Sequence, residues 1–400
     1  MKDTHASENG IIWVSLIFLI ATPIAAAILV PWYLLTHAVP TAAITTALIL
    51  WGITGMGICA GYHRLFAHRC YKANPLLRAF LLIAGAGALE NSAIAWCAAH
   101  RFHHRHVDTD EDPYNAKRGF WFSHIGWVFR RGAHHGDLSS VPDLLQDPLC
   151  RWQDRYYLVI GALFNVGLPV LLGWLTGDVL GMLIFAGLVR VIVVHHFTFT
   201  INSLAHMWGR QPWSPSNTSR DNWIISLISF GEGYHNYHHS FQSDYRNGPL
   251  WYNYDPGKWF IWSMSRIGLA SDLHRAPADV VYRRRFKEKR AALSEHLSRW
   301  GERIEEWKAR PGSPSLCPRQ DLLNHLLNAE AQLKSALAEL KAARLRLTSE
   351  PLERIGAAWR AQRRAQFRRA KRSAQKTLRH WEMLAQSYIA RLDPAPEFGT

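Results

Sequence analysis

Residues 11–37 read IIWVSLIFLIATPIAAAILVPWYLLTH and contain no Asp, Glu, Lys or Arg. An apolar stretch of this length is long enough to cross a bilayer as a helix. A secretory signal has a shorter apolar core and a small-residue cleavage site. We therefore interpret residues 11–37 as a membrane span.

The same pattern recurs along the chain. A short break at residues 38–40 is followed by a second apolar stretch at 41–62, and residues 156–175 and 179–201 form a third and a fourth. The sequence thus predicts four spans in two hairpins and excludes a purely soluble globular protein. Residues 76–89 are apolar but only about 14 residues long, which favours an interfacial or partly embedded helix, with a fifth span as the alternative.

The two hairpin turns, at 37–40 and 176–178, carry no Lys or Arg. The basic residues that flank the spans all lie on the opposite side, and positive flanks favour the cytoplasm. We therefore expect residues 63–155 and the residues after 201 to form a helical cap on the cytoplasmic side.

The charged residues divide the chain into two parts. Residues 276–400 contain 26 Lys and Arg against 14 Asp and Glu, so the formal net charge of +15 lies mainly in the C-terminal third. We expect a membrane domain over residues 1–275 and a basic helical extension over residues 276–400.

The extension itself reads as helices. Residues 283–310 predict a charged helix, and a leucine spacing of three and four residues predicts an amphipathic or coiled-coil-like helix over 323–347, with Glu330 and Arg344 as the two misfits. Prolines predict a linker and a new helix start: Pro311, Pro314, Pro318 and Pro351. The basic last helix could touch anionic lipids or an acidic electron donor; a solvated tail is the alternative, and no motif supports nucleic-acid binding.

Histidines form the chemical signal of the chain. The five cysteines never form a CxxC pair, so neither a zinc ribbon nor a disulfide framework is indicated. Eight histidines instead stand in three clusters outside the predicted spans: His63 and His68; His100, His103 and His104; His235, His238 and His239.

The spacing of these histidines points to metal binding. In the last two clusters they stand at i, i+3 and i+4, which places them on one helical face. Neutral imidazole binds iron, zinc, copper or nickel, and eight imidazoles are too many for one ion and suit two. Asn202 and His206, four residues apart, add a further pair of candidates. An oxidative reaction would favour iron, because zinc has no redox chemistry.

The motifs resemble those of the membrane fatty acid desaturases, and within them the acyl-CoA, or stearoyl-CoA-type, delta-9 desaturases. The matching segments are Gly61–His68, His100–His104 followed by Asp108–Pro113, Asn202–His206, and Gly231–His239. The resemblance covers roughly residues 10–275. It implies an all-α integral membrane protein whose cytosolic cap carries a histidine-rich di-iron site.

The resemblance also assigns ligands to two iron ions (Fe²⁺). The first ion would be held by His63, His68, His100, His104 and His238. The second would be held by His103, His206, His235 and His239, with Asn202 nearby through water.

The implied activity is oxygen-dependent desaturation of a long-chain saturated acyl chain to a cis-monounsaturated product. A separate electron donor of the cytochrome b5, ferredoxin or rubredoxin type would serve it, because no His-Pro-Gly-Gly haem motif is present. Asn91, Trp96 and Arg131 match family positions for substrate contacts. Animal members place an Arg-Asp pair where this chain has Ala98 and Ala99, so an acyl-lipid or acyl-carrier-protein substrate stays open beside acyl-CoA.

Two other functions remain possible at this point. A membrane hydroxylase of alkyl or sterol substrates uses similar histidine clusters, and a metal transporter or sensor would need ligands at mid-membrane. Arg190 inside the fourth span is a functional candidate that could face a polar cavity, or a structural hydrogen-bonder. Glu232 could orient a ligand histidine by accepting its second N–H. Asp108, Asp110 and Asp112 could do the same, with a solvated acidic loop as the alternative. His195 and His196 are expected to have supporting or surface roles rather than to bind metal.

Overall fold

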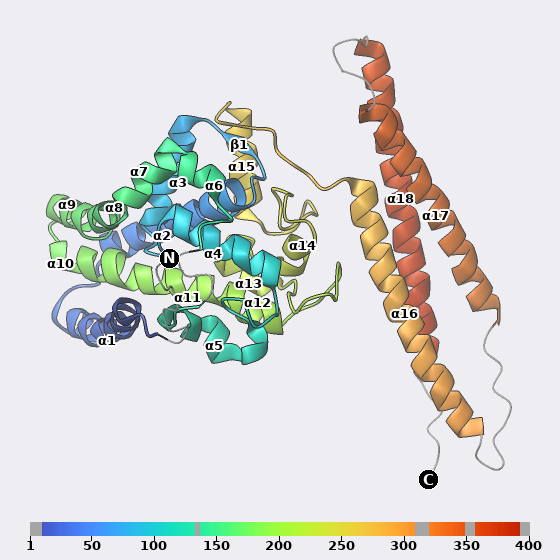
Figure 1. Cartoon of the computed structure of the whole chain (residues 1–400), viewed down its shortest axis with the longest axis horizontal. Coiled ribbons are helices and arrows are strands. Elements are labelled where there is room, and N and C mark those ends of the chain that lie inside the picture. The colour runs from blue at the N-terminus through green and yellow to red at the C-terminus, as the bar shows by residue number, and fades with distance from the viewer. Residues whose placement is uncertain (1–9, 133–136, 309–319, 349–356, 393–400) are drawn as a thin grey trace, which may run out of the picture. The chain divides into compact units, whose positions relative to one another are not determined.

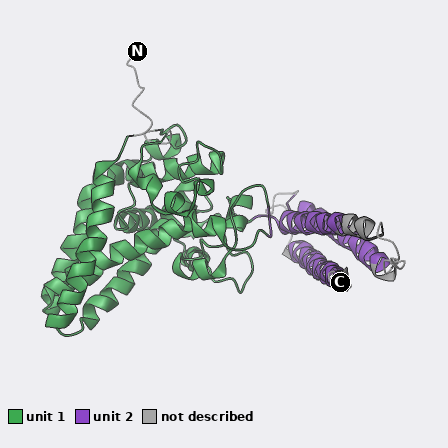
Figure 2. Cartoon of the chain, turned by 90° about the horizontal axis from the view of Figure 1, so that it is seen from below, with its two compact units in different colours: residues 1–211, 215–275 green, residues 212–214, 276–400 purple. Residues whose placement is uncertain are grey.

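The computed structural model describes residues 10–132, 137–308, 320–348 and 357–392, which fold almost entirely into helices and loops (Figure 1). The chain divides into two compact units (Figure 2). Unit 1 comprises residues 1–211 and 215–275, and unit 2 comprises residues 212–214 and 276–400.

Among the described residues, four helices of unit 1 are long and apolar enough to cross a membrane, and they form two hairpins, which confirms the all-α fold with four spans. Three of them contain stretches of wide, π-type turns, labelled η1, η4 and η5; the labels η2 and η3, used below, denote short 3₁₀ helices. In chain order the pieces are α1 (Trp13–Thr36); α2 (Thr41–Met56) with η1 (Gly57–Ala67); α8 (Tyr157–Ala162), η4 (Leu163–Gly167) and α9 (Leu168–Thr176); and α10 (Val179–Gly181), η5 (Met182–Val189), α11 (Arg190–Asn202) and α12 (Leu204–Met207).

Two of these helices run further than the sequence predicts. The second continues to Ala67 and the fourth to Met207, so His63 and His206 lie on the last turns of these helices, past the ends expected for the spans. Every residue of η1 is buried. The polar end of this helix therefore continues into the protein rather than into lipid, which an apolar-length count does not detect.

Close packing explains Gly57 in the second span, and a left-handed backbone conformation explains Gly177 in the second hairpin turn. A Cβ added at Gly57 would lie 2.3 Å from the backbone nitrogen of Gly85, so only glycine allows this approach. Gly177 has a φ of +79° and ends α9. Asp178 caps the next helix by accepting from Gly181 N at 2.7 Å, and it accepts from Tyr33 Oη at 2.6 Å. Tyr33 lies on α1, so this bond joins the two hairpins.

Arg190 is a structural residue of the fourth helix. It is buried, and its guanidinium donates to the carbonyls of Gly87 at 2.8 Å and Ala186 at 3.1 Å and to the side chain of Asn165. It does not line the large cavity described below. The expectation that it faces a polar cavity is therefore wrong, and the hydrogen-bonding alternative holds.

The cap consists of short helices between and after the hairpins. Its first helix, α3 (Pro75–Ala86), has 12 residues and is capped by Asn74, whose side chain accepts from Leu77 N at 2.9 Å. This length is too short for a fifth span. The remaining elements are β1 (Lys72–Ala73) paired with β2 (Ala270–Ser271), α4 (Ala93–His106), η2 (Ala116–Arg118), α5 (Phe120–His124), η3 (Gly126–Phe129), α6 (Pro142–Gln146), α7 (Pro148–Arg155), α13 (Trp223–Ile228), α14 (His235–Ser240) and α15 (Pro256–Arg266).

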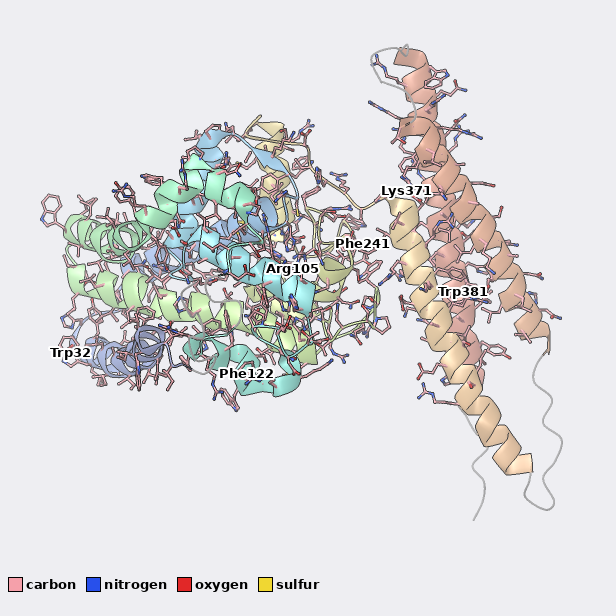
Figure 3. All side chains as sticks on the ribbon, viewed as in Figure 1. Trp32, Arg105, Phe122, Phe241, Lys371 and Trp381 are labelled. Atoms are coloured by element: carbon pink, nitrogen blue, oxygen red, sulfur yellow. The ribbon has the colours of Figure 1, made fainter. Side chains whose placement is uncertain are left out.

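The part of unit 2 that the structure describes forms three long helices, α16 (Ala278–Lys308), α17 (Gln320–Thr348) and α18 (Ala357–Leu392). They share a core in which Leu333, Leu340 and Trp381 are fully buried (Figure 3). The last helix is therefore not merely a solvated tail, because its apolar face is packed against its neighbours.

The two misfits in the leucine pattern of α17 are ion-pair partners. Arg344 pairs with Asp279 at 2.7 Å, and Glu330 lies 3.1 Å from Arg290 and 2.7 Å from Lys334. These charges link or flank the helices rather than interrupt the core. The predicted linker at Pro311, Pro314 and Pro318 and the helix start at Pro351 lie outside the described residues.

Candidate metal centre

Nine histidines of unit 1 converge into two groups. The first contains His63, His68, His100, His104 and His238, and the second contains His103, His206, His235 and His239. Each histidine of a group offers one ring nitrogen, and within the group these nitrogens all lie within 4.8 Å of one another. These are the two sets that the resemblance to desaturases implies.

Two short helices place the groups side by side. Helix α4 contributes His100 and His104 to the first group and His103 to the second. Helix α14 contributes His238 to the first group and His235 to the second. Because residues at i, i+3 and i+4 diverge slightly around a helix, one helix can serve two adjacent sites. The rings of His104 and His239, one from each group, lie 4.4 Å apart.

The spacing of the ring nitrogens fits a bound metal. Successive Nε2 atoms lie 2.8–3.1 Å apart in the first group and 3.1–3.4 Å apart in the second. Imidazole nitrogens bound at about 2.0–2.1 Å keep neighbouring nitrogens about 3 Å apart. The geometry and the all-nitrogen donor set therefore suit transition metals.

Burial keeps these imidazoles in the form that binds metal. It lowers the pKa of six rings well below the ordinary value, and neighbouring imidazoles lower the pKa of each ring further: His68, His100, His104, His235, His238 and His239. A neutral ring has a free nitrogen lone pair, and metal binding requires that form.

A buried carboxylate holds the first group in place. Oε2 of Glu232 lies 2.8 Å from Nδ1 of His63, and its Oε1 accepts from Arg64 at 2.9 Å. Arg64 in turn pairs with Asp255 at 2.9 Å, and Asn247 donates to Glu232. Burial raises the pKa of Glu232, but His63 and Arg64 outweigh burial and hold that pKa well below its usual range. Glu232 therefore orients His63 so that Nε2 faces the group.

The second group has similar support. Oδ1 of Asp112 lies 2.7 Å from Nδ1 of His103, and the Tyr114 ring stacks on that imidazole at 4.3 Å. Thr218 Oγ1 lies 2.8 Å from Nδ1 of His206 and donates to Asp108 Oδ1 at 2.6 Å. The orienting roles expected of Asp108, Asp112 and Glu232 therefore have matching contacts. Asp110 is exposed, and no contact with a histidine of either group is seen for it among the described residues.

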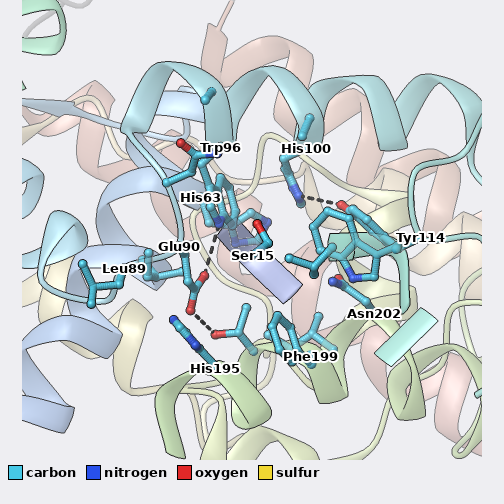
Figure 4. A pocket seen from close by; sticks show the side chains of 18 of the residues that line it. Ser15, His63, Leu89, Glu90, Trp96, His100, Tyr114, His195, Phe199 and Asn202 are labelled. Atoms are coloured by element: carbon cyan, nitrogen blue, oxygen red, sulfur yellow. Dashed lines mark hydrogen bonds between the residues drawn. The ribbon is translucent and has the colours of Figure 1, made fainter. Parts of the chain in front are cut away.

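A large cavity borders both histidine groups. Its volume is about 570 Å³, within the range of small-molecule sites. His63, His100 and Asn202 line it (Figure 4), and His235 lines it as well. Apolar residues of the first hairpin and of α8 form much of the rest, including Ile12, Phe18, Leu19, Ile58 and Leu158.

The predicted substrate residues divide between cavity and surface. Asn91 and Trp96 line the cavity, and the Trp96 ring stacks on His100 at 4.9 Å. Arg131 does not line it, although its neighbours Trp127 and Val128 do. His195 lines the cavity, with Nε2 2.9 Å from the carbonyl oxygen of Ala88, and belongs to neither histidine group.

Comparison with known proteins identifies the family. Residues 36–258 match the model of the family described as fatty acid desaturase. This match covers more than half of the chain and contains all nine histidines. The chain belongs to the fatty acid desaturase family. The family match ends before residue 276, where the helices of unit 2 begin.

Three desaturase relatives illustrate the likeness. A probable acyl-CoA desaturase of Schizosaccharomyces pombe is 42% identical over 275 residues, covering 68% of this chain and 57% of the relative. Acyl-CoA desaturase 1 of Saccharomyces cerevisiae is 38% identical over 308 residues, covering 75% and 59%. The sn-2 palmitoyl-lipid 9-desaturase of Nostoc is 33% identical over 271 residues, covering 66% and 91%. The chain thus spans less than two thirds of the two fungal relatives.

Sequence reasoning missed several residues of this desaturase site. Tyr114 approaches both groups, since its hydroxyl lies 3.4 Å from Nδ1 of His100. Asn247 and Thr218 bind the orienting residues, and Glu90 and Thr198 line the cavity. Of these residues, only Glu90 could have been singled out from the sequence, because it is a lone carboxylate directly after an apolar stretch. The others have no sequence pattern that distinguishes them.

Removing unit 2 tests whether the desaturase site is self-contained. All nine histidines and the cavity lie in unit 1, and unit 2 has its own core. Deletion of residues 276–400 is therefore expected to leave the amount of metal per chain unchanged, measured by elemental analysis of the purified protein. Loss of metal from a truncated protein that still inserts into membranes would show that unit 2 supports the site.

Proposed function

We propose that this chain is an oxygen-dependent desaturase that introduces a cis double bond at the delta-9 position of a long-chain saturated acyl-CoA. The observation that carries the proposal is the pair of adjacent all-histidine groups bordering a largely apolar cavity. Membership of the fatty acid desaturase family and the names of the fungal relatives support it.

Two iron ions would occupy the histidine groups. His63, His68, His100, His104 and His238 would hold one, and His103, His206, His235 and His239 the other, with Asn202 reaching the second through water. Bound iron supplies the dioxygen-dependent redox chemistry that zinc lacks.

The overall reaction removes one hydrogen from each of two neighbouring methylene groups. Dioxygen takes up these two hydrogens with two electrons and two protons from outside, and two waters leave. A separate carrier protein of the cytochrome b5, ferredoxin or rubredoxin type would deliver the electrons. The Lys- and Arg-free hairpin turns support a cytoplasmic position for the site, where such a carrier would act.

The chain's own residues position the acyl chain and exclude water. Apolar walls from α1 and α8 fit methylene groups, and Trp96, stacked on His100, fixes one wall beside the first histidine group. Glu232 and Asp112 keep the ligand rings from rotating when the substrate enters. Holding the reacting carbons in one place accounts for much of the selectivity expected of such a site.

An acyl-lipid substrate is the second candidate. Ala98 and Ala99 line the cavity where animal relatives have a charged pair, and the Nostoc relative is named as an acyl-lipid desaturase. Both observations favour a head group other than CoA, whereas the fungal relatives favour CoA.

Product analysis tests the proposed function. The iron-loaded protein with a reducing system and dioxygen is expected to convert stearoyl-CoA into a product with one cis double bond between carbons 9 and 10, located by mass spectrometry after derivatisation. Parallel reactions with a stearoyl lipid in vesicles and without dioxygen serve as controls. An alcohol product without an alkene would identify a hydroxylase. Conversion of the stearoyl lipid but not of stearoyl-CoA would show that the substrate is an acyl-lipid.

A further inference from the structure

A carboxyl group stands in the wall of the otherwise largely apolar cavity. Glu90 lies in the turn between α3 and α4, is half-buried, and lines the cavity (Figure 4). Its neighbours Leu89 and Asn91 have φ values of 57° and 90°, a conformation that residues other than glycine rarely adopt. Because a residue of this kind stands on each side of Glu90, the fold holds this side chain in place.

Two neutral groups bind the Glu90 carboxyl. Thr198 Oγ1 donates to Oε1 at 2.7 Å, and Trp96 Nε1 donates to Oε2 at 3.2 Å. No ion pair of Glu90 with a cation is seen among the described residues. An ionised carboxylate here would therefore have hydrogen bonds but no compensating charge.

The charged and titratable groups near Glu90 do not form an ion pair with it among the described residues. Arg190 donates to the Gly87 carbonyl, and Asp154 accepts from Ser92. The remaining groups facing this turn or the same cavity are the Tyr62 and Tyr157 phenols, the His195 and His63 imidazoles, and the Glu232 carboxylate, which is held by Arg64. None of them supplies a positive charge dedicated to Glu90.

This environment favours the neutral acid. Burial raises the pKa of Glu90 to about 7, although the hydrogen bonds from Thr198 and Trp96 act in the opposite direction. Near neutral pH the empty cavity therefore holds both forms. An acyl chain would displace water from the cavity, and the loss of water would disfavour the ionised form further.

We propose that acyl chains occupy the cavity only when Glu90 is protonated, so that substrate binding takes up one proton at this carboxyl. The inference rests on the proposed function for the identity of the substrate. In the protonated form the acid O–H donates to Thr198 Oγ1 while the other oxygen still accepts from Trp96 Nε1. A glutamine can reproduce both bonds with its amide, because its NH₂ group donates and its oxygen accepts.

The pH dependence of substrate affinity follows from this coupling. Below about pH 7 the acid is already protonated, so the KM for the acyl substrate is expected to be constant. Above that pH the KM is expected to rise about tenfold per pH unit, because each unit lowers the protonated fraction tenfold. The kcat is expected to change much less, because bound substrate carries the proton with it.

The Glu90→Gln variant of the full-length protein provides the test. The KM of this variant is expected to stay independent of pH up to about pH 9, while Glu295→Gln, at an exposed carboxyl of α16, is expected to keep the wild-type profile. Calorimetric titration with acyl-CoA at about pH 8 in two buffers of different ionisation enthalpy counts protons without turnover. The wild type is expected to take up close to one proton and Glu90→Gln none.

The possible outcomes separate this inference from the proposed function. If wild-type protein forms no alkene but takes up a proton at Glu90 on binding acyl-CoA, the function fails and the coupling stands. If alkene forms and Glu90→Gln retains the wild-type pH profile and proton count, the coupling is wrong. Should Glu90→Gln fail to fold, Thr198→Val replaces it. Loss of that hydroxyl is expected to move the rise in KM to higher pH, and an unmoved rise would overturn the inference.

Discussion

Replacing His238 with alanine is expected to abolish metal binding by the first histidine group and to reduce turnover by more than about 100-fold, since loss of an outer partner alone costs 10–100-fold. Nε2 of His238 lies 3.0 Å from that of His63 and 2.9 Å from that of His104, so its ring closes the group from the α14 side. The ring is buried, and no other histidine of α14 belongs to this group.

Metal content per chain and turnover would be measured together for this variant. His274→Ala is the matched control, because His274 is an exposed histidine of unit 1 outside both groups. The control is expected to match the wild type in both measurements. Full turnover by His238→Ala would contradict the ligand assignment.

Replacing Glu232 with alanine is expected to have the largest effect on stability. Arg64 would lose its 2.9 Å contact with Glu232 and keep only Asp255 and the Tyr245 carbonyl, although its side chain is just 1% exposed. Removing one partner of a buried ion pair typically costs about 3–5 kcal/mol. His63 would also lose the carboxylate that fixes its ring, so the variant should lose metal from the first group.

The comparison is with Glu295→Ala, whose exposed side chain pairs with Arg299 at 3.6 Å on the same helix. Thermal unfolding in detergent and metal analysis would be followed for both variants. A midpoint for Glu232→Ala that equals that of Glu295→Ala would show that the buried network contributes little.

Much of this fold and site could be predicted from the sequence. Long uncharged stretches predicted the four spans, because lipid tolerates few charges. The i, i+3, i+4 spacing of histidines predicted two helical faces, and the structure gives those faces to α4 and α14. Which ring joins which group came from the family resemblance, because spacing alone does not fix how two helices face each other.

The failures of prediction have a common cause, which is that sequence does not show tertiary contacts. For Arg190 the sequence left a polar cavity and a structural hydrogen bond open, and only the fold shows that the Gly87 carbonyl of a distant turn accepts from its guanidinium. His63 and His206 lie on helices that extend past their apolar segments because they are buried by protein. Glu90 read as the end of an apolar helix, and only the folded chain places it in the cavity wall.

The central claim is that two clusters of imidazoles bind two iron ions beside an acyl cavity. Elemental analysis combined with X-ray absorption spectroscopy of the purified wild-type protein tests it most directly. The expected result is two irons per chain, each with a first shell dominated by nitrogen. One metal per chain, or a first shell dominated by carboxylate oxygen, would contradict it.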